Sequence, residues 1–227
     1  MPDTVRPYHH IPIADCQEEL IEISPELGVI QPHPYQNLGA KYDRYSPHHL
    51  RRGVVERLLV AQQTLQQTQP GWQLAIFDGY RPVAVQKFMV EYTFNSICHS
   101  QSLDPEALTL QTSESIWARV LQVWAFPNPN PDTPPPHSTG AAVDLTLFDH
   151  QGKLVDMGSP IDELSDRSLP DYYPANTIYH RNRYLLHQVM TKAGFQRHPQ
   201  EWWHFSWGDQ MWAWLSGETT AIYGRVE

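Results

Sequence analysis

A proline-rich segment limits the folds that this chain can adopt. Six prolines fall within the sixteen residues 125–140, AFPNPNPDTPPPHSTG. Proline lacks a backbone N–H and fixes φ, so this segment can form neither a helix interior nor a central strand. It leads directly into residues 141–149, AAVDLTLFD, where apolar residues alternate as in a half-buried strand. The sequence therefore predicts a stiff loop that enters a sheet.

The predicted strand carries a carboxylate on one of its faces. With a period of two, Val143 and Leu145 share one face, while Asp144 lies on the opposite face among small residues. His137 lies in the preceding loop, and a bend at Gly140 would bring it over Asp144. Two interpretations are open at this point: a histidine hydrogen-bonded to a carboxylate, or two ligands of a metal site.

A second motif, EWWH at residues 201–204, favours the metal site. Glu201 lies just upstream of His204, as in hydrolases that place a glutamate beside a metal-bound water. The alternative is a core strand whose histidine is satisfied by hydrogen bonds. His137, Asp144 and His204 together offer two imidazoles and one carboxylate, and catalytic zinc sites use about three protein ligands plus water. We therefore predict a zinc site with Glu201 as the neighbouring carboxylate.

Helix and strand patterns along the chain predict an α+β fold. The expected helices cover residues 46–69, 82–99, part of 104–124, and 176–193. The expected strands cover residues 72–78, 141–149, 153–157 and 201–209. Ser46 fits the N-cap of the first helix, Asn176 that of the last, and Gly194 a helix stop. The order of elements favours an antiparallel sheet flanked by helices, in a single domain spanning residues 1–227.

Composition and charge narrow the possible partners. The chain has 227 residues, of which 41% are hydrophobic, enough for a sizeable core. Its formal charge is −9 without a basic cluster, so neither nucleic acid nor an anionic membrane is an expected partner. No apolar run approaches the roughly 18 residues of a membrane span, and no secretory signal is visible. Cys16 and Cys98 are expected to be buried free thiols, which favours a cytoplasmic protein.

The motifs resemble those of a known enzyme family. Residues 137–144 fit the pattern H-x-x-G-x-A-x-D, and residues 201–204 fit E-x-W-H. This pair is similar to that of the zinc D,D-peptidases, which share a fold with lysostaphin-type enzymes and the hedgehog signalling domain. With DGYRP, MGSPID and YQNLGAKY, the chain more specifically resembles the D-alanyl-D-alanine dipeptidases of vancomycin-resistance operons and their housekeeping relatives. The similarity runs from Tyr35 to Gly208.

The resemblance implies roles for individual residues. His137, Asp144 and His204 would bind one Zn²⁺ per chain. Glu201 would act as general base and then as general acid. Arg81, in DGYRP, would stabilise the transition state, although an arginine in such a turn can also simply tie loops together.

Substrate contacts are implied as well. Asp162, in MGSPID, resembles the carboxylate near the amino end of the substrate, whereas by its local sequence it could be a solvated loop acid. Tyr35 and the loop after it are candidates for a wall that excludes longer chains. The family motif has a serine two residues before its first histidine, and this chain has Pro135 there, so any hydrogen bond from that serine is absent. The sequence identifies no donor for the substrate carboxylate.

We therefore expect a zinc dipeptidase that hydrolyses free D-alanyl-D-alanine in peptidoglycan metabolism. One alternative is a D,D- or L,D-carboxypeptidase acting on peptidoglycan peptides, which would need export to reach an assembled wall. Another is a zinc-bearing binding module without hydrolysis, against which the presence of Glu201 and Arg81 speaks. The sequence does not indicate an oligomeric state.

Overall fold

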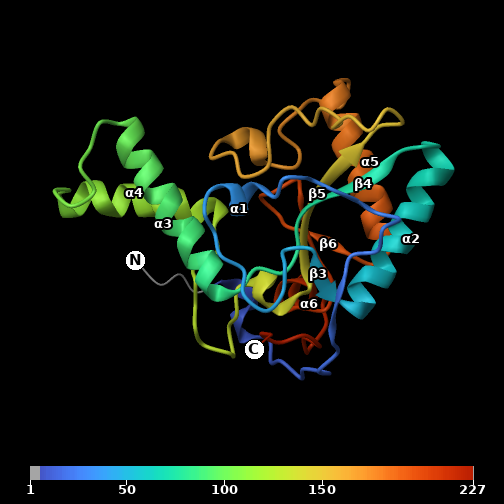
Figure 1. Ribbon diagram of the computed structural model, residues 1–227, viewed down its shortest axis with the longest axis horizontal. Coiled ribbons are helices and arrows are strands. Elements are labelled where there is room, and N and C mark those ends of the chain that lie inside the picture. Colours follow the sequence, from blue (N-terminus) through green and yellow to red (C-terminus); the bar gives the residue numbers. More distant parts are fainter. Residues whose placement is uncertain (1–5, 227) are drawn as a thin grey trace.

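The fold places helices on both faces of a mixed sheet (Figure 1). The computed structural model describes residues 6–226. Its α-helices are α1 (Pro34–Asn37), α2 (Arg52–Thr68), α3 (Val83–Ser100), α4 (Leu110–Val123), α5 (Ile178–Lys192) and α6 (Gln210–Ser216). Its strands are β1 (Leu20–Glu22), β2 (Gly28–Val29), β3 (His49–Arg51), β4 (Gln73–Asp78), β5 (Ala142–Phe148), β6 (Gln196–Arg197) and β7 (His204–Ser206). Short 3-10 helices are η1 (Pro7–His10), η2 (Pro136–Thr139) and η3 (Asp166–Ser168).

The main sheet contains five strands in the order β2-β4-β5-β7-β6. The pairs β4–β5, β5–β7 and β7–β6 are antiparallel, whereas β2 runs parallel to β4. A separate antiparallel pair joins β1 to β3. The predicted α+β class is confirmed, and the sheet is antiparallel as expected except at its β2 edge.

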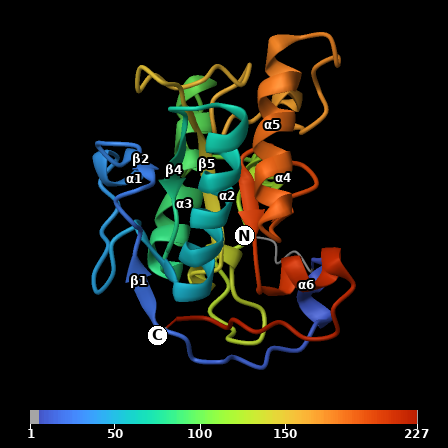
Figure 2. The ribbon, with the colours of Figure 1, turned by 90° about the vertical axis from the view of Figure 1, so that its right-hand side faces the viewer.

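The two faces of β5 separate the apolar core from a polar site. Val143 and Leu145 are fully buried in the cluster formed with the inner faces of α2 and α5. Figure 2 shows these two helices side by side over that face of the sheet. Asp144 and Thr146 alternate with the core residues and so point to the opposite face. The period-two pattern of the sequence therefore predicted the orientation of this strand correctly.

The predicted start of the helix over residues 46–69 was wrong. Before α2 begins, the chain forms β3, in which Leu50 pairs with Ile21 of β1. Ser46 does not cap a helix; its hydroxyl accepts the backbone N–H of His48 at 3.2 Å and stabilises a turn. Pairing with a distant strand thus overrides the local helical pattern, which is a non-local effect that periodicity cannot report.

The other predicted helices are confirmed, with differences at their ends. They correspond to α3, α4 and α5. The N-cap of α5 is Thr177, whose hydroxyl accepts the His180 N–H at 3.2 Å, rather than Asn176. Helix α6 was not expected; Asp209 caps it by accepting the Trp212 N–H at 2.8 Å.

Two predicted strands are shorter than expected. The segment over residues 153–157 makes only an isolated bridge between Leu154 and Phe148 after its turn, and no full strand. The strand expected over residues 201–209 is reduced to β7, with a bend before it.

The proline-rich segment forms the expected stiff loop and ends in a sharp bend. Gly140 has a φ of +70°, the left-handed conformation that glycine adopts most easily. Its N–H donates to the His137 carbonyl at 3.2 Å, and its own carbonyl accepts the Arg51 N–H at 2.9 Å. A Cβ at this position would lie 2.3 Å from Cδ2 of Leu20. The bend therefore requires glycine both for its backbone conformation and for its packing.

The cysteines differ from each other in exposure. Cys98 is a buried free thiol as expected, but Cys16 is free and exposed, so the prediction for Cys16 was wrong. Cys16 belongs to an extended surface segment, and its backbone N–H donates to the carbonyl of Ile222 at 3.0 Å. Within residues 6–226, no helix combines the length and apolar character that crossing a membrane requires.

Alanine at Gly140 should destabilise the fold more than alanine at Gly152. Both glycines have left-handed φ values, +70° and +73°, which cost other residues roughly 1–2 kcal/mol. Nothing lies within 4 Å of a Cβ built at Gly152, so only Gly140→Ala adds a steric clash. We expect an additional loss of about 1–3 kcal/mol for Gly140→Ala in urea denaturation. Equal losses at the two positions would contradict the close packing.

Candidate metal centre

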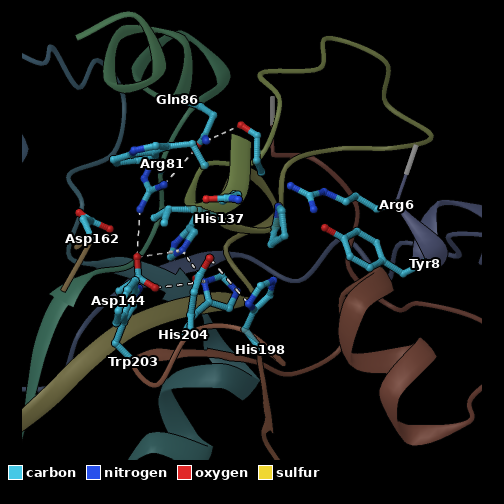
Figure 3. A pocket seen from close by; sticks show the side chains of 16 residues that line it. Arg6, Tyr8, Arg81, Gln86, His137, Asp144, Asp162, His198, Trp203 and His204 are labelled. Atoms are coloured by element: carbon cyan, nitrogen blue, oxygen red, sulfur yellow. Dashed lines mark hydrogen bonds and ion pairs between the residues drawn. The ribbon is translucent and has the colours of Figure 1, made fainter. Parts of the chain in front are cut away.

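Three buried side chains converge from three elements of the fold (Figure 3). His137 is carried by η2, Asp144 by β5 and His204 by β7. Nε2 of His137 lies 3.2 Å from Nδ1 of His204 and 3.2 Å from Oδ2 of Asp144. Nδ1 of His204 lies 3.0 Å from Oδ1 of Asp144. The structure thus brings together the three residues that the sequence predicted as ligands.

The register of the sheet explains how these residues meet. Asp144 and His204 are direct partners across β5 and β7, so their side chains share a face. Asp78 is the partner of Asp144 across β4 and β5, after a bulge between Ile76 and Asp78. Strict alternation would have put Asp78 on the same face as Ile76, inside the apolar core. The bulge therefore turns a second carboxylate toward the site.

The geometry of the three ligand atoms fits a metal ion. Tetrahedral zinc ligands at about 2.0–2.1 Å lie about 3.3 Å from one another, close to the 3.0–3.2 Å separations found here. His137 donates its Nδ1 proton to the Gly79 carbonyl at 2.8 Å, which leaves the Nε2 lone pair facing the other ligands. His204 places Nε2 3.4 Å from the Ser206 hydroxyl and directs Nδ1 inward. Acceptor atoms this close repel one another unless a cation or a proton lies among them.

Asp144 is ionised in these surroundings. Burial by itself would raise its pKa, but the charges and hydrogen bonds of His137 and His204 hold that pKa well below its usual range. Arg81 also donates Nη2–H to Oδ2 of Asp144 at 3.0 Å. A carboxylate must be deprotonated to bind a metal, so its environment prepares Asp144 for this role.

Arg81 is a buried guanidinium beside the three ligands. Nε donates to Oδ2 of Asp78 at 2.8 Å, and Nη1 donates to Oε1 of Gln86 at 2.9 Å. With the bond to Asp144, its single positive charge lies between two carboxylates. Its guanidinium also lies 4.9 and 5.1 Å from the centroids of two aromatic rings. Arg81 thus both lines the pocket and fixes two aspartates.

Glu201 is a buried carboxyl that lines the same pocket. It lies at the bend before β7, as the sequence predicted, with Oε2 3.9 Å from Nδ1 of His204. Burial raises the pKa of Glu201 well above its usual range, and the negative charges of Asp144 and Asp162 raise it further. The protonated form of Glu201 is therefore more stable than that of a solvated glutamate, which favours a role in general acid–base chemistry.

Asp162 borders the pocket from the loop after β5. It adopts a φ of +65°, which is uncommon for a residue other than glycine. Burial raises the pKa of Asp162 to about 7, and the charge of Asp144 adds to this effect. Tyr35 donates its hydroxyl proton to Asp162 at 2.7 Å and accepts Nη2–H of Arg81 at 3.2 Å. The structure places Tyr35 behind Asp162 and Arg81, where it orients both, rather than on the pocket wall.

Several residues of the site were missed in the sequence. Asp78 is fully buried and receives hydrogen bonds from Arg81 and Tyr42, while His33 lies 3.1 Å from it. The signal for Asp144 was a carboxylate within an alternating strand, on the face opposite the apolar residues. Asp78 instead falls on the apolar face of its strand by strict alternation, so this signal does not identify it. His33 and Tyr42 carry no comparable signal because they reach Asp78 from a distant loop.

Three further polar residues that the sequence did not indicate line the pocket wall. His198 lies with its Nδ1 3.7 Å from Oε1 of Glu201, and burial lowers the pKa of His198 to about 3. Arg6 and Tyr8 enter from the start of the described chain. No local sequence pattern connects them with the motifs around His137 and His204, which lie more than a hundred residues away in the chain.

Comparisons with known proteins agree on one family. A family model described as D-ala-D-ala dipeptidase matches residues 29–220, which include all seven predicted site residues. A D-alanyl-D-alanine dipeptidase of Synechocystis sp. is 50% identical over 98% of this chain and 98% of that protein. Its counterpart in Enterococcus faecium is 33% identical over 69% of this chain and 72% of that protein. The solved structure of VanYB in complex with D-Alanine-D-Alanine has 15% identity and a TM-score of 0.46, covering 79% of this chain and 87% of that one.

Loss of either histidine ligand should remove metal binding while the fold persists. We expect His137→Ala and His204→Ala each to weaken zinc affinity by more than about 10- to 100-fold. That smaller loss is typical when only a residue hydrogen-bonded to a metal ligand is removed. Zinc at about 100 times Kd should stabilise the wild type by about 2.7 kcal/mol and the variants by much less. Thermal melting with and without zinc measures this difference, and His99→Ala, at an exposed position, is the control. Undiminished zinc stabilisation of both variants would exclude this site.

Asp162 should make the stability of the metal-free protein depend on pH. Its pKa is raised from 3.8 to about 7, so the native state holds this proton more tightly than the unfolded chain. The contribution of Asp162 to the free energy of unfolding therefore falls as pH rises from about 4 to about 7. Asp162→Asn removes that contribution, so the variant should gain stability relative to wild type across this window. Urea denaturation at several pH values, with Asp43→Asn as an exposed control, tests this; a difference independent of pH would contradict it.

Proposed function

The chain belongs to the D-ala-D-ala dipeptidase family of metallopeptidases, and we propose that it hydrolyses free D-alanyl-D-alanine with one zinc ion per chain. The observation that carries this proposal is the convergence of His137, Asp144 and His204 in a pocket that also contains Glu201. Two imidazoles and a carboxylate are a ligand set that suits zinc and leaves a position for water. When bound, zinc would supply Lewis-acid polarisation and a more acidic water molecule.

Glu201 is the proposed general base and general acid. Its carboxylate would accept a proton from water as the water attacks the peptide carbonyl, and would then deliver that proton to the leaving amine. Burial favours this cycle because the protonated form of Glu201 is already stabilised in the pocket. Among residues 6–226, apart from the ligand Asp144, no other carboxyl lies both in the pocket and as close to His204.

Arg81 is proposed to stabilise the negative charge that develops on the carbonyl oxygen. Its guanidinium lines the pocket next to Asp144 and stays charged at any working pH. The hydrogen bonds to Asp78 and Gln86 fix the guanidinium plane before substrate arrives. Such preorganised charge stabilises a transition state without reorganisation during the reaction.

Asp162 is proposed to bind the ammonium group of the dipeptide, with Tyr35 as its positioning residue. The hydroxyl of Tyr35 holds the Asp162 carboxylate at the pocket edge. An ammonium ion beside this carboxylate would favour its ionised form, which burial otherwise disfavours. Amino-end recognition would therefore come from one half-buried acid on a strained loop.

A cytoplasmic location and a role in peptidoglycan metabolism complete the proposal. The thiols of Cys16 and Cys98 are free, which suits a reducing compartment. A free D,D-dipeptide is a small substrate of the kind that wall-peptide metabolism handles. The proposal treats the chain as one catalytic domain.

A peptide assay with a Glu201 variant tests the function. Zinc-loaded wild type should cleave D-alanyl-D-alanine and leave a tripeptide ending in D-Ala-D-Ala intact. Glu201→Ala should retain zinc by elemental analysis but lose about 10²- to 10⁴-fold in kcat, the contribution typical of general acid–base catalysis. Glu218→Ala, at an exposed position, should behave as wild type.

The other outcomes point to other functions. Cleavage of the tripeptide alone would indicate a carboxypeptidase, and cleavage of neither peptide would indicate a binding module. Full activity of Glu201→Ala would exclude Glu201 as the base.

A further inference from the structure

The residues assigned so far leave the substrate carboxylate without a partner. A free dipeptide carries an ammonium group and a carboxylate, and Asp162 suits only the first. The donors of Arg81 nearest the ligands are engaged with Asp78 and Asp144. Pro136 lines the pocket, and none of the three prolines at residues 134–136 has a backbone N–H to offer. A cationic side chain elsewhere on the pocket wall is therefore the natural candidate for a carboxylate donor.

Arg6 is a cation on the other side of this pocket. Its side chain lines the same pocket as the three ligands, and Figure 3 shows its guanidinium directed inward, across those ligands from Asp162. Nη2 donates to the carbonyl of Leu121 at 2.8 Å. Within residues 6–226 this is the only hydrogen bond of the guanidinium, and no carboxylate there lies within ion-pair distance of it, although its charge lowers the pKa of Glu201 across the pocket. Since arginine has several N–H donors, most of them remain available to a ligand.

The backbone around Arg6 holds this side chain in place. Its N–H donates to Nδ1 of His9 at 3.2 Å, and its carbonyl accepts the His9 N–H at 3.1 Å. Pro7 restricts Arg6 to extended conformations, and the observed φ and ψ are −92° and 151°. The Leu121 carbonyl belongs to the last turn of α4, where carbonyls lack a partner within the helix. Arg6 is therefore fixed before any ligand binds, which reduces the entropy cost of binding.

Tyr8 lies beside Arg6 and closes the same side of the pocket (Figure 3). Its side chain is buried against Trp214 and His9. Its hydroxyl makes no hydrogen bond within the described part of the chain, so a phenolic donor faces the pocket next to the guanidinium. An arginine fork with a neighbouring hydroxyl is a donor set that matches a carboxylate.

We propose that Arg6 binds the C-terminal carboxylate of the dipeptide, so that the pocket recognises the zwitterion at both ends. This inference rests on the proposed dipeptidase function and deepens it. Asp162 and Arg6 would contact opposite ends of the substrate, with the ligands His137, Asp144 and His204 between them. It also makes the segment before residue 29, outside the part matched by the family model, a determinant of specificity.

Comparison of the dipeptide with its C-terminal amide tests the role of Arg6. With the zinc-loaded full chain, Arg6→Gln should raise KM for D-alanyl-D-alanine about 10- to 100-fold with little change in kcat, as expected for lost ground-state binding. D-alanyl-D-alaninamide has no carboxylate, so its kcat/KM should be the same for wild type and Arg6→Gln. Arg6→Lys, which keeps the charge but not the fork, should fall between them.

Arg181→Gln is the matched control, because Arg181 also donates to a backbone carbonyl but is exposed and distant from the pocket. It should retain wild-type constants for both substrates. An unchanged preference for dipeptide over amide in Arg6→Gln would overturn the proposal. If that variant fails to fold, equal kcat/KM values of the wild type for dipeptide and amide would overturn it instead.

A binding measurement separates this inference from the dipeptidase function. Calorimetric titration of D-alanyl-D-alanine into Glu201→Ala, with and without Arg6→Gln, reports affinity without turnover. About 10- to 100-fold weaker binding in the double variant supports the carboxylate site, even if the wild type proves to hydrolyse nothing. Equal affinities overturn the carboxylate site, even if the wild type is an active dipeptidase.

Discussion

Asp78 and Asp144 lie directly opposite each other on the neighbouring strands β4 and β5, and both are buried. Like charges in that position would destabilise the sheet, but Arg81 donates hydrogen bonds to both carboxylates. Breaking a buried ion pair of this kind typically costs about 3–5 kcal/mol, so the three charges must fold together. The orientation of the ligand Asp144 therefore depends on a guanidinium that also lines the pocket, and fold and site share one set of interactions.

The sequence predicts the centre of the site well because local rules determine it. Alternation along β5 places Asp144 opposite the core, and Gly140 supplies the bend that returns His137 over the strand. The EWWH motif identifies His204 and places it on a short strand. The antiparallel register that sets it directly across from Asp144 is seen only in the structure, and it completes the ligand set that the motifs predicted.

Other parts of the fold and site depend on contacts between distant segments. The same alternation would assign Asp78 to the core, and only the bulge in β4 turns it toward Arg81. Pairing with β1 converts the expected first turn of a helix into β3. Arg6 reaches the pocket because the carbonyl of Leu121 at the end of α4 anchors it. No local pattern encodes a bulge, the pairing of two distant strands or a hydrogen bond between distant segments, so the sequence could not predict them.

Charge in the pocket is arranged so that substrate binding and proton movement are linked. In the metal-free protein the pKa of Asp162 is about 7, so this carboxyl is protonated in a large fraction of molecules near neutral pH. In the proposed complex an ammonium group would stabilise the ionised form, and its binding would release a proton from Asp162. Glu201 has a pKa that is raised for the same reason, burial among other acids. The negative charge of Asp162 is itself one cause of the raised pKa of Glu201, so ionisation of these two acids is linked. In the proposed complex an ammonium group beside Asp162 would offset that charge, which would tie recognition of the amino end to the proton affinity of Glu201.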